Sequence, residues 1–235
     1  MHEVQRRKDR RPEQQKQRPA RLEKAQRQQL FGKKIKLSET AEFRPEGISP
    51  PAFWSELRDG DAEALALQNR GRPFASSEVL AVARRCRFGF PQAVVSAPLS
   101  RDVRPFPTLF WLTCPFLKHR CGELESLQKI SELEKVFESM PGEIGRYHAD
   151  YAALRLSLVP RDAREKLERT NPAMLAVLAE SGVGGISYAG GCAAPKCLHL
   201  QTAAWLGMGR HPASEWLAAE IGPLECASGV CASFN

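Results

Sequence analysis

The sequence predicts an α+β fold in which a small antiparallel or mixed sheet precedes a helical majority, with a disordered basic tail at the N-terminus. Three observations support this. Short apolar and β-branched runs at 79–83, 93–97 and 108–113 are typical of strands. From Pro115 onward, apolar residues recur at spacings of three, four and seven with charges between them, as in amphipathic helices. Residues 1–50 combine few apolar groups with high net charge, which favours disorder.

Charge divides the chain into two parts. We expect residues 1–52 to be a disordered basic tail and linker, and residues 53–235 to be a single α+β domain. Of the 34 basic and 27 acidic residues, 13 and four lie within residues 1–36, so the remainder of the chain is close to neutral. The tail predicts weak, salt-dependent contact with nucleic acid or another acidic surface. A solubilising extension, or a stretch that precedes the true start codon, would have the same composition.

The order of elements follows from apolar patterns and from helix start and stop signals. The run 108–113 is apolar on both faces, which predicts the central strand of the sheet. A short helix is expected to begin at Asp59 or Asp61 and to end at Asn69. Further helices are expected from Pro115 to the break at Pro141-Gly142, then at 144–158, 171–182, 196–206 and 212–221.

The seven cysteines carry most of the chemical information. No segment approaches the roughly 18 uninterrupted apolar residues of a membrane-spanning helix, and the N-terminus lacks the apolar stretch of a secretory signal. We therefore expect a cytoplasmic protein that does not enter a membrane. In that reducing compartment, cysteines indicate metal binding or catalysis more often than disulfides.

Several cysteines fall at the ends of predicted elements. Cys86 ends the first strand and Cys114 ends the third, so both lie at one end of the sheet if the three strands form a meander. Cys197 begins a helix, and it can share a site with His199 only if it belongs to the capping region. Unpaired amides at that helix start would stabilise a thiolate.

These positions suggest a zinc ion or iron–sulfur cluster held by Cys86, Cys114, Cys197 and either His199 or Cys226. Three segments share a spacing: Cys114-x4-His119-x-Cys121, Cys192-x4-Cys197-x-His199 and Cys226-x4-Cys231. This spacing is wider than the C-x2-C pairs of zinc ribbons and is a weak signal. Cysteines that are simply small buried apolar residues would give the same pattern, and Cys121 is expected to be one of them.

Five segments resemble the bacterial domain-of-unknown-function family 501. They are Ala-Val-Ala-Arg-Arg-Cys86, Ala97-Pro98, Phe-Pro-Thr-Leu-Phe-Trp-Leu-Thr-Cys-Pro115, Ser-Gly-Val-Gly-Gly-Ile186 and Lys-Cys-Leu-His199, and the similarity spans about residues 60–220. The resemblance implies no activity, because the family has none assigned. It also implies a helix with His148, Tyr151 and Arg155 on one face, a candidate polar pocket that a solvated helix face would mimic. The basic tail and Cys192 depart from the family pattern, so either Cys192 or a C-terminal cysteine could complete a metal site.

Three functions follow as hypotheses. The leading one is a cysteine-based metal site, and the second is nucleic-acid association through the basic tail. The third is an enzyme: Cys197 with His199 or His148 could form a thiol nucleophile and base, but the sequence supplies no evident third group. Alternatively, the glycines of residues 181–191 could cradle a phosphate before Lys196, although they match neither common phosphate-binding motif.

Overall fold

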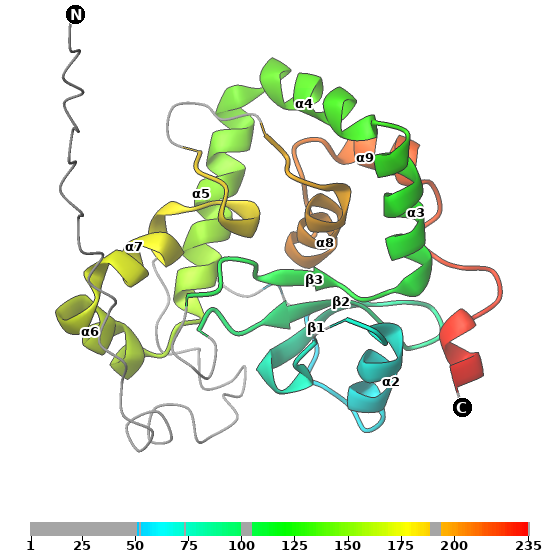
Figure 1. Cartoon of the computed structure of the whole chain (residues 1–235), viewed down its shortest axis with the longest axis horizontal. Coiled ribbons are helices and arrows are strands. Elements are labelled where there is room, and N and C mark those ends of the chain that lie inside the picture. Colours follow the sequence, from blue (N-terminus) through cyan, green and yellow to red (C-terminus); the bar gives the residue numbers. More distant parts are fainter. Residues whose placement is uncertain (1–50, 52, 73, 100–104, 189–193, 235) are drawn as a thin grey trace, which may run out of the picture.

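The computed structural model describes residues 51, 53–72, 74–99, 105–188 and 194–234. Within these ranges the chain forms one three-stranded antiparallel sheet and eight α-helices (Figure 1), which confirms the predicted α+β class. The predicted basic tail and Cys192 lie outside the described residues, so both predictions about them stay predictions. Among the described helices, none has both the length and the apolar content needed to cross a membrane.

The elements follow one another along the chain with short connections. The strands are β1 (Val79–Arg85), β2 (Pro91–Ser96) and β3 (Phe110–Leu112). The α-helices are α2 (Asp61–Gln68), α3 (Pro115–Ser126), α4 (Lys129–Ser139), α5 (Pro141–Ser157), α6 (Arg161–Thr170), α7 (Pro172–Glu180), α8 (Leu198–Met208) and α9 (Ser214–Ile221). Short 3-10 turns are η2 (Ser76–Glu78), η3 (Val183–Gly185) and η4 (Val230–Phe234).

The central strand of the sheet is β2, since the strand order is β1-β2-β3 with both pairings antiparallel. The prediction that 108–113 is central was wrong. All six β2 residues are buried, because Ala93 and Val95 join the main core while Val94 packs with Leu65 beneath the sheet. At the edge, β3 has only three residues, and its Trp111 side chain is 38% exposed.

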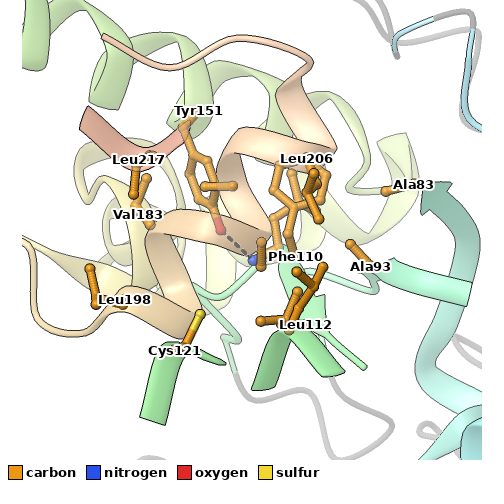
Figure 2. Packing of buried hydrophobic residues seen from close by; sticks show 14 of the residues in the cluster. Ala83, Ala93, Phe110, Leu112, Cys121, Tyr151, Val183, Leu198, Leu206 and Leu217 are labelled. Atoms are coloured by element: carbon orange, nitrogen blue, oxygen red, sulfur yellow. Dashed lines mark hydrogen bonds between the residues drawn. The ribbon is translucent and has the colours of Figure 1, made fainter. Parts of the chain in front are cut away.

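Helix α8 lies at the centre of the molecule. In Figure 1 it sits above the sheet, surrounded by the arch of α5, α4 and α3, while α2 covers the opposite face of the sheet. Gly207 lets α8 approach β3 closely, since a Cβ atom there would overlap the Phe110 ring. Figure 2 shows Phe110 within this core, beside Tyr151, whose hydroxyl accepts a hydrogen bond from the Leu109 amide at 2.6 Å. The core between α8 and the sheet therefore fixes the start of β3.

The helical region differs from the prediction in two places. Apolar periodicity continues from 115 to 139, but the chain forms two helices because Gln128 adopts a left-handed conformation with φ of 62° between α3 and α4. The prediction also lacked α6, which buries only Ala163 and Leu167 and is otherwise charged. Two buried residues in ten give a weak apolar pattern.

Candidate metal centre

Cys86 is held at the end of β1 by a tight turn. Its amide donates to the Phe90 carbonyl at 2.9 Å, and the Gly89 amide donates to the Cys86 carbonyl at 2.8 Å. Gly89 has φ of 88°, a conformation that glycine adopts without steric cost. The sequence Cys86-Arg-Phe-Gly89 thus connects β1 to β2 and places the thiol at this end of the sheet.

Cys114 lies at the same end, after β3. It is the N-cap residue of α3, and Pro115 is the first residue of that helix, where a missing N–H costs nothing. The Cys114 amide donates to the Gln92 carbonyl at 3.2 Å, which ties the cap to β2. Because β1 and β3 both run antiparallel to β2, Cys86 and Cys114 lie at one end of the sheet, as the sequence predicted.

The C-terminal segment returns to this end of the sheet and brings two more cysteines. Arg87 donates to the carbonyls of Cys226 and Ala227 at 3.0 and 3.1 Å, and Gln92 donates to the Leu224 carbonyl at 2.6 Å. Gln68 of α2 donates to the Cys231 sulfur at 3.3 Å. Figure 1 shows this segment in red beside α2 and the start of α3.

The four thiols surround one small cavity of about 10 Å³, which is room for one water-sized particle. Its lining residues are Gln68, Cys86, Phe88, Phe90, Pro91, Gln92, Cys114, Cys226, Gly229 and Cys231. We call this group of Cys86, Cys114, Cys226 and Cys231 the four-cysteine cluster. No three of its sulfur atoms lie within 4.8 Å of one another.

Burial favours the neutral thiol form of two of these cysteines, Cys114 and Cys231. Burial raises the pKa of the Cys114 thiol to about 11, although the amides of Leu117 and Phe116 act in the opposite direction. Burial also raises the pKa of Cys231, and the neighbouring Cys86 and Cys226 raise it further. The Gln68 side-chain oxygen is buried and has no hydrogen-bond partner among the described residues. A cation in the cavity would favour the thiolate forms.

Cys197 and His199 lie in a different place, with Glu125. Their ligand atoms and a Glu125 oxygen all lie within 4.8 Å of one another. Cys197 is the N-cap of α8 in an extended conformation, which meets the condition under which it can share a site with His199. Glu125, near the end of α3, accepts hydrogen bonds from the Leu198 amide at 2.7 Å and lies 2.9 Å from His199 Nδ1. We call these three residues the Glu–Cys–His cluster.

The remaining cysteine of the described residues is part of the core. Cys121 is fully buried and lies 3.4 Å from the Thr202 hydroxyl. Burial raises its thiol pKa to about 11. Figure 2 places it beside α8, among apolar side chains. This agrees with its expected role as a small buried residue.

The helix face of His148, Tyr151 and Arg155 is buried, and its polar atoms bind backbone except for His148 Nε2, which has no partner among the described residues. Arg155, with none of its surface exposed, donates to the carbonyls of Leu178, Ser181, Gly182 and Pro107. His148 Nδ1 accepts from the Val183 amide at 3.2 Å. These contacts hold the glycine-rich segment 182–185 against α5 and the irregular segment that leads into β3. In this arrangement the three side chains act as internal supports.

The predicted ligands therefore divide between two clusters. Cys86, Cys114 and Cys226 share one cavity, whereas Cys197 and His199 belong to the other cluster. Sequence reasoning missed Cys231 and Glu125. The repeated Cys-x4-Cys spacing was a signal for Cys231, but nothing local distinguishes Glu125 from the other glutamates of α3.

Comparison with known families gives one match. Residues 82–219 match the family model described as protein of unknown function (DUF501). The chain belongs to this family. The DUF501 match spans Cys86, Cys114 and the whole Glu–Cys–His cluster, and ends before Cys226 and Cys231. The curated proteins and the solved structures contain no match to the chain.

Proposed function

We propose that this DUF501 protein binds a single zinc ion through Cys86, Cys114, Cys226 and Cys231. The observation that supports the proposal best is the meeting of four cysteines at one ion-sized cavity. They come from three separate segments: a hairpin turn, a helix N-cap and the C-terminal segment. Four thiolates are a common ligand set of structural zinc sites.

The size of the cavity favours a single ion. Gln68 also lines it, and the Gln68 side-chain oxygen is buried without a hydrogen-bond partner among the described residues, which is rare in proteins. The cavity has room for about one atom, whereas an iron–sulfur cluster needs room for several iron and sulfide atoms. Among the two cofactors predicted from the sequence, a single zinc ion therefore fits better.

Binding in this proposal involves a small closing movement. Tetrahedral zinc with bonds of about 2.3 Å brings its sulfur ligands to about 3.8 Å apart. In the four-cysteine cluster no three sulfur atoms lie within 4.8 Å of one another, so the sulfur atoms must move closer to bind the ion. Cys226 and Cys231 lie after the last α-helix, in a segment whose only regular element is η4. Their approach to Cys86 and Cys114 would close the site without disturbing the sheet.

The proposed zinc has a structural role. It would join the C-terminal segment to the β1–β2 turn and to the start of α3, much as a disulfide or metal joins distant segments of small domains. The site needs reduced thiols, so the proposal places the protein in a reducing compartment such as the cytoplasm. The described residues offer no support for the nucleic-acid hypothesis.

For the thiol-enzyme hypothesis, Glu125 supplies the third group that the sequence lacked. The His199 ring, however, is not hydrogen-bonded to the Cys197 thiol that it would have to activate. Both ring nitrogens of His199 face oxygen acceptors, Glu125 Oε1 at 2.9 Å and the Lys118 carbonyl at 3.1 Å, and no hydrogen bond joins the ring to Cys197. Burial raises the pKa of the Cys197 thiol, which disfavours the reactive thiolate. These contacts favour a metal-binding function over thiol catalysis.

Metal analysis of the full chain, purified without oxygen, tests the zinc proposal. We expect one zinc per chain that resists dialysis against a weak chelator. The variant Cys231→Ser should lose it, while Cys121→Ala, a control that removes a core thiol, should keep it. Less than about 0.2 metal per chain in the wild type, with stability unaffected by chelators, would overturn the proposal. A brown protein that contains iron and sulfide would indicate an iron–sulfur cluster and would overturn the assignment of zinc.

A further inference from the structure

We propose that Glu125, Cys197 and His199 form a second metal site, which takes one exchangeable divalent ion of the zinc class and leaves a coordination position open. This inference does not rest on the four-cysteine cluster. It rests on three donor atoms of different chemistry that already lie within 4.8 Å of one another. The site lies within the part of the chain that matches the DUF501 family.

The backbone brings these three side chains together. Cys197 has φ of −152° and ψ of 156°, so its side chain leaves the chain before the first turn of α8. His199 follows within that first turn, and Glu125 reaches both from the last turn of α3. Lys196, the residue before Cys197, adopts a left-handed φ of 64° and donates to the Gly184 carbonyl at 2.6 Å. The fold thus positions the Cys197 thiol beside the other two side chains before an ion binds.

The hydrogen bonds of His199 match those of a metal-bound histidine. Metal-ligating histidines usually donate their second ring N–H to a backbone carbonyl or carboxylate. His199 Nε2 lies 3.1 Å from the Lys118 carbonyl, which can accept its N–H. The other ring nitrogen, Nδ1, lies 2.9 Å from Glu125 Oε1 and so is the nitrogen beside the carboxylate.

The contact between His199 Nδ1 and Glu125 places two metal-ligating atoms side by side. Nδ1 lies 2.9 Å from Glu125 Oε1. A hydrogen bond between the imidazole and the carboxylate satisfies this contact, and a metal ion bound by both atoms would satisfy it as well. With the Cys197 sulfur within 4.8 Å of both atoms, the three residues supply three ligands for one ion.

The donor set defines the class of ion. One thiolate, one imidazole nitrogen and one carboxylate suit zinc and cobalt, and they do not suit calcium or magnesium, which prefer oxygen alone. Binding would displace the proton of the Cys197 thiol. Three protein ligands leave a fourth tetrahedral position for water, as in zinc sites that exchange or activate a bound ligand.

Exposure distinguishes this site from a buried structural one. The side chains of His199 and Glu125 are 28% and 25% exposed, and Cys197 is half-buried. An ion can therefore reach the cluster from solvent without unfolding, and water can occupy the open position. We expect weaker, reversible binding here.

A cobalt titration of the full chain tests the inference. Co2+ alone is added, without oxygen, to metal-free protein, and sulfur-to-cobalt charge-transfer absorption reports thiolate ligation. We expect a weaker binding event with one-thiolate intensity that is lost in Cys197→Ser and weakened at least about tenfold in His199→Gln. His119→Gln is the matched control, since His119 lies 3.4 Å from Glu123 on the exposed face of α3 with no cysteine in that pair.

The outcomes separate the two sites. Loss of a four-thiolate event in Cys231→Ser concerns the zinc proposal only, and loss of the one-thiolate event in Cys197→Ser concerns this inference only. Equal cobalt binding by wild type, Cys197→Ser and His199→Gln, with unchanged circular dichroism, would overturn it. If Cys197→Ser fails to fold, Glu125→Gln provides the test, because an amide oxygen can still accept from the Leu198 amide but carries no charge.

Discussion

The two clusters at opposite ends of α3 are built in different ways. Cys114 caps the start of this helix and Glu125 lies near its end, about 16 Å apart along the axis at about 1.5 Å per residue. The four-cysteine cluster is all sulfur, with Cys114 and Cys231 buried and Cys86 and Cys226 partly exposed, and it is completed by the C-terminal segment. The Glu–Cys–His cluster is mixed, half-exposed and formed by two helix termini. The first arrangement suits a structural ion, and the second suits an exchangeable one.

This difference also affects what holds each cluster together. The Glu–Cys–His cluster has its own hydrogen bonds, since Glu125 accepts from the Leu198 amide at 2.7 Å and His199 Nε2 lies 3.1 Å from the Lys118 carbonyl. In the four-cysteine cluster the backbone is hydrogen-bonded, for example by Arg87 to the Cys226 carbonyl at 3.0 Å, but the side-chain bond to a thiol is that of Gln68 to Cys231 at 3.3 Å. Removing metal should therefore disturb the first end of α3 far more than the second.

The largest expected effect is on stability after metal removal. A strong chelator should lower the free energy of unfolding by about 4 kcal/mol, which corresponds to ligand at about a thousand times its dissociation constant. Urea unfolding with and without chelator measures this. The same comparison on Cys231→Ser should show no chelator effect, and a large remaining effect would place the stabilising ion elsewhere.

Acid should produce the next largest effect, through histidines that lie in the core. Burial lowers the pKa of His148 to about 4 and that of His211 to about 3. The ordinary value for an unfolded chain is about 6.5, so below that pH the unfolded state binds protons that the folded state does not, and stability falls as pH falls. From pH 6.5 to 5.5 we expect a loss of about 2 kcal/mol in metal-free protein.

The contacts of these histidines explain why they stay neutral. His211 Nδ1 accepts from the Ala213 amide at 3.0 Å, and His148 Nε2 is buried with no partner among the described residues. Urea unfolding of metal-free His211→Gln across this pH range is the check, and the slope should fall by about half. An unchanged slope would contradict the assignment to these two residues.

A smaller effect is expected at the second cluster from Glu125→Ala. This variant removes the acceptor for the Leu198 amide at the start of α8, which is comparable to the loss of an N-cap side chain. Unfolding should become easier by about 1 kcal/mol. Glu123→Ala is the control, because among the described residues the Glu123 carboxylate pairs with His119 and Arg120 on the surface of α3, and its loss should cost less than about 0.5 kcal/mol.

The smallest effect is expected from Cys197→Ser without metal. Serine is a good N-cap residue, so the start of α8 should persist and the free energy of unfolding should change by less than about 0.5 kcal/mol. Thermal unfolding in chelator measures this. A loss of several kcal/mol would indicate that Cys197 supports the core and not an exchangeable ion.

The sequence indicated three of the four cysteines and two of the three members of the second cluster. Cys86 and Cys114 could be placed together because strand ends and turn signals are local, and a meander puts the first and third strands in the same direction. Cys197 and His199 could be paired through the capping condition. Cys231 and Glu125 reach their clusters through tertiary contacts, made by the C-terminal segment and by the packing of α3 on α8, and apart from the Cys-x4-Cys spacing no local pattern encodes these.

The error in the sheet has a related cause. The run 108–113 is apolar on both faces, which suggested a central strand. Trp111 is instead partly exposed, and it stacks on Phe106 with ring centroids 5.6 Å apart. Stacking on a neighbouring ring lets a large aromatic residue lie on an exposed edge strand, so apolar content alone does not reveal strand order. The inference that required only strand direction survived, whereas the one that required strand order did not.

The most direct test of the central claim is the zinc content of the full chain after anaerobic purification and dialysis against a weak chelator, measured together for wild type, Cys231→Ser and Cys197→Ser. We predict about one zinc per chain in the wild type and in Cys197→Ser, and almost none in Cys231→Ser. Zinc that is retained by Cys231→Ser, or absent from all three proteins, would contradict the four-cysteine site.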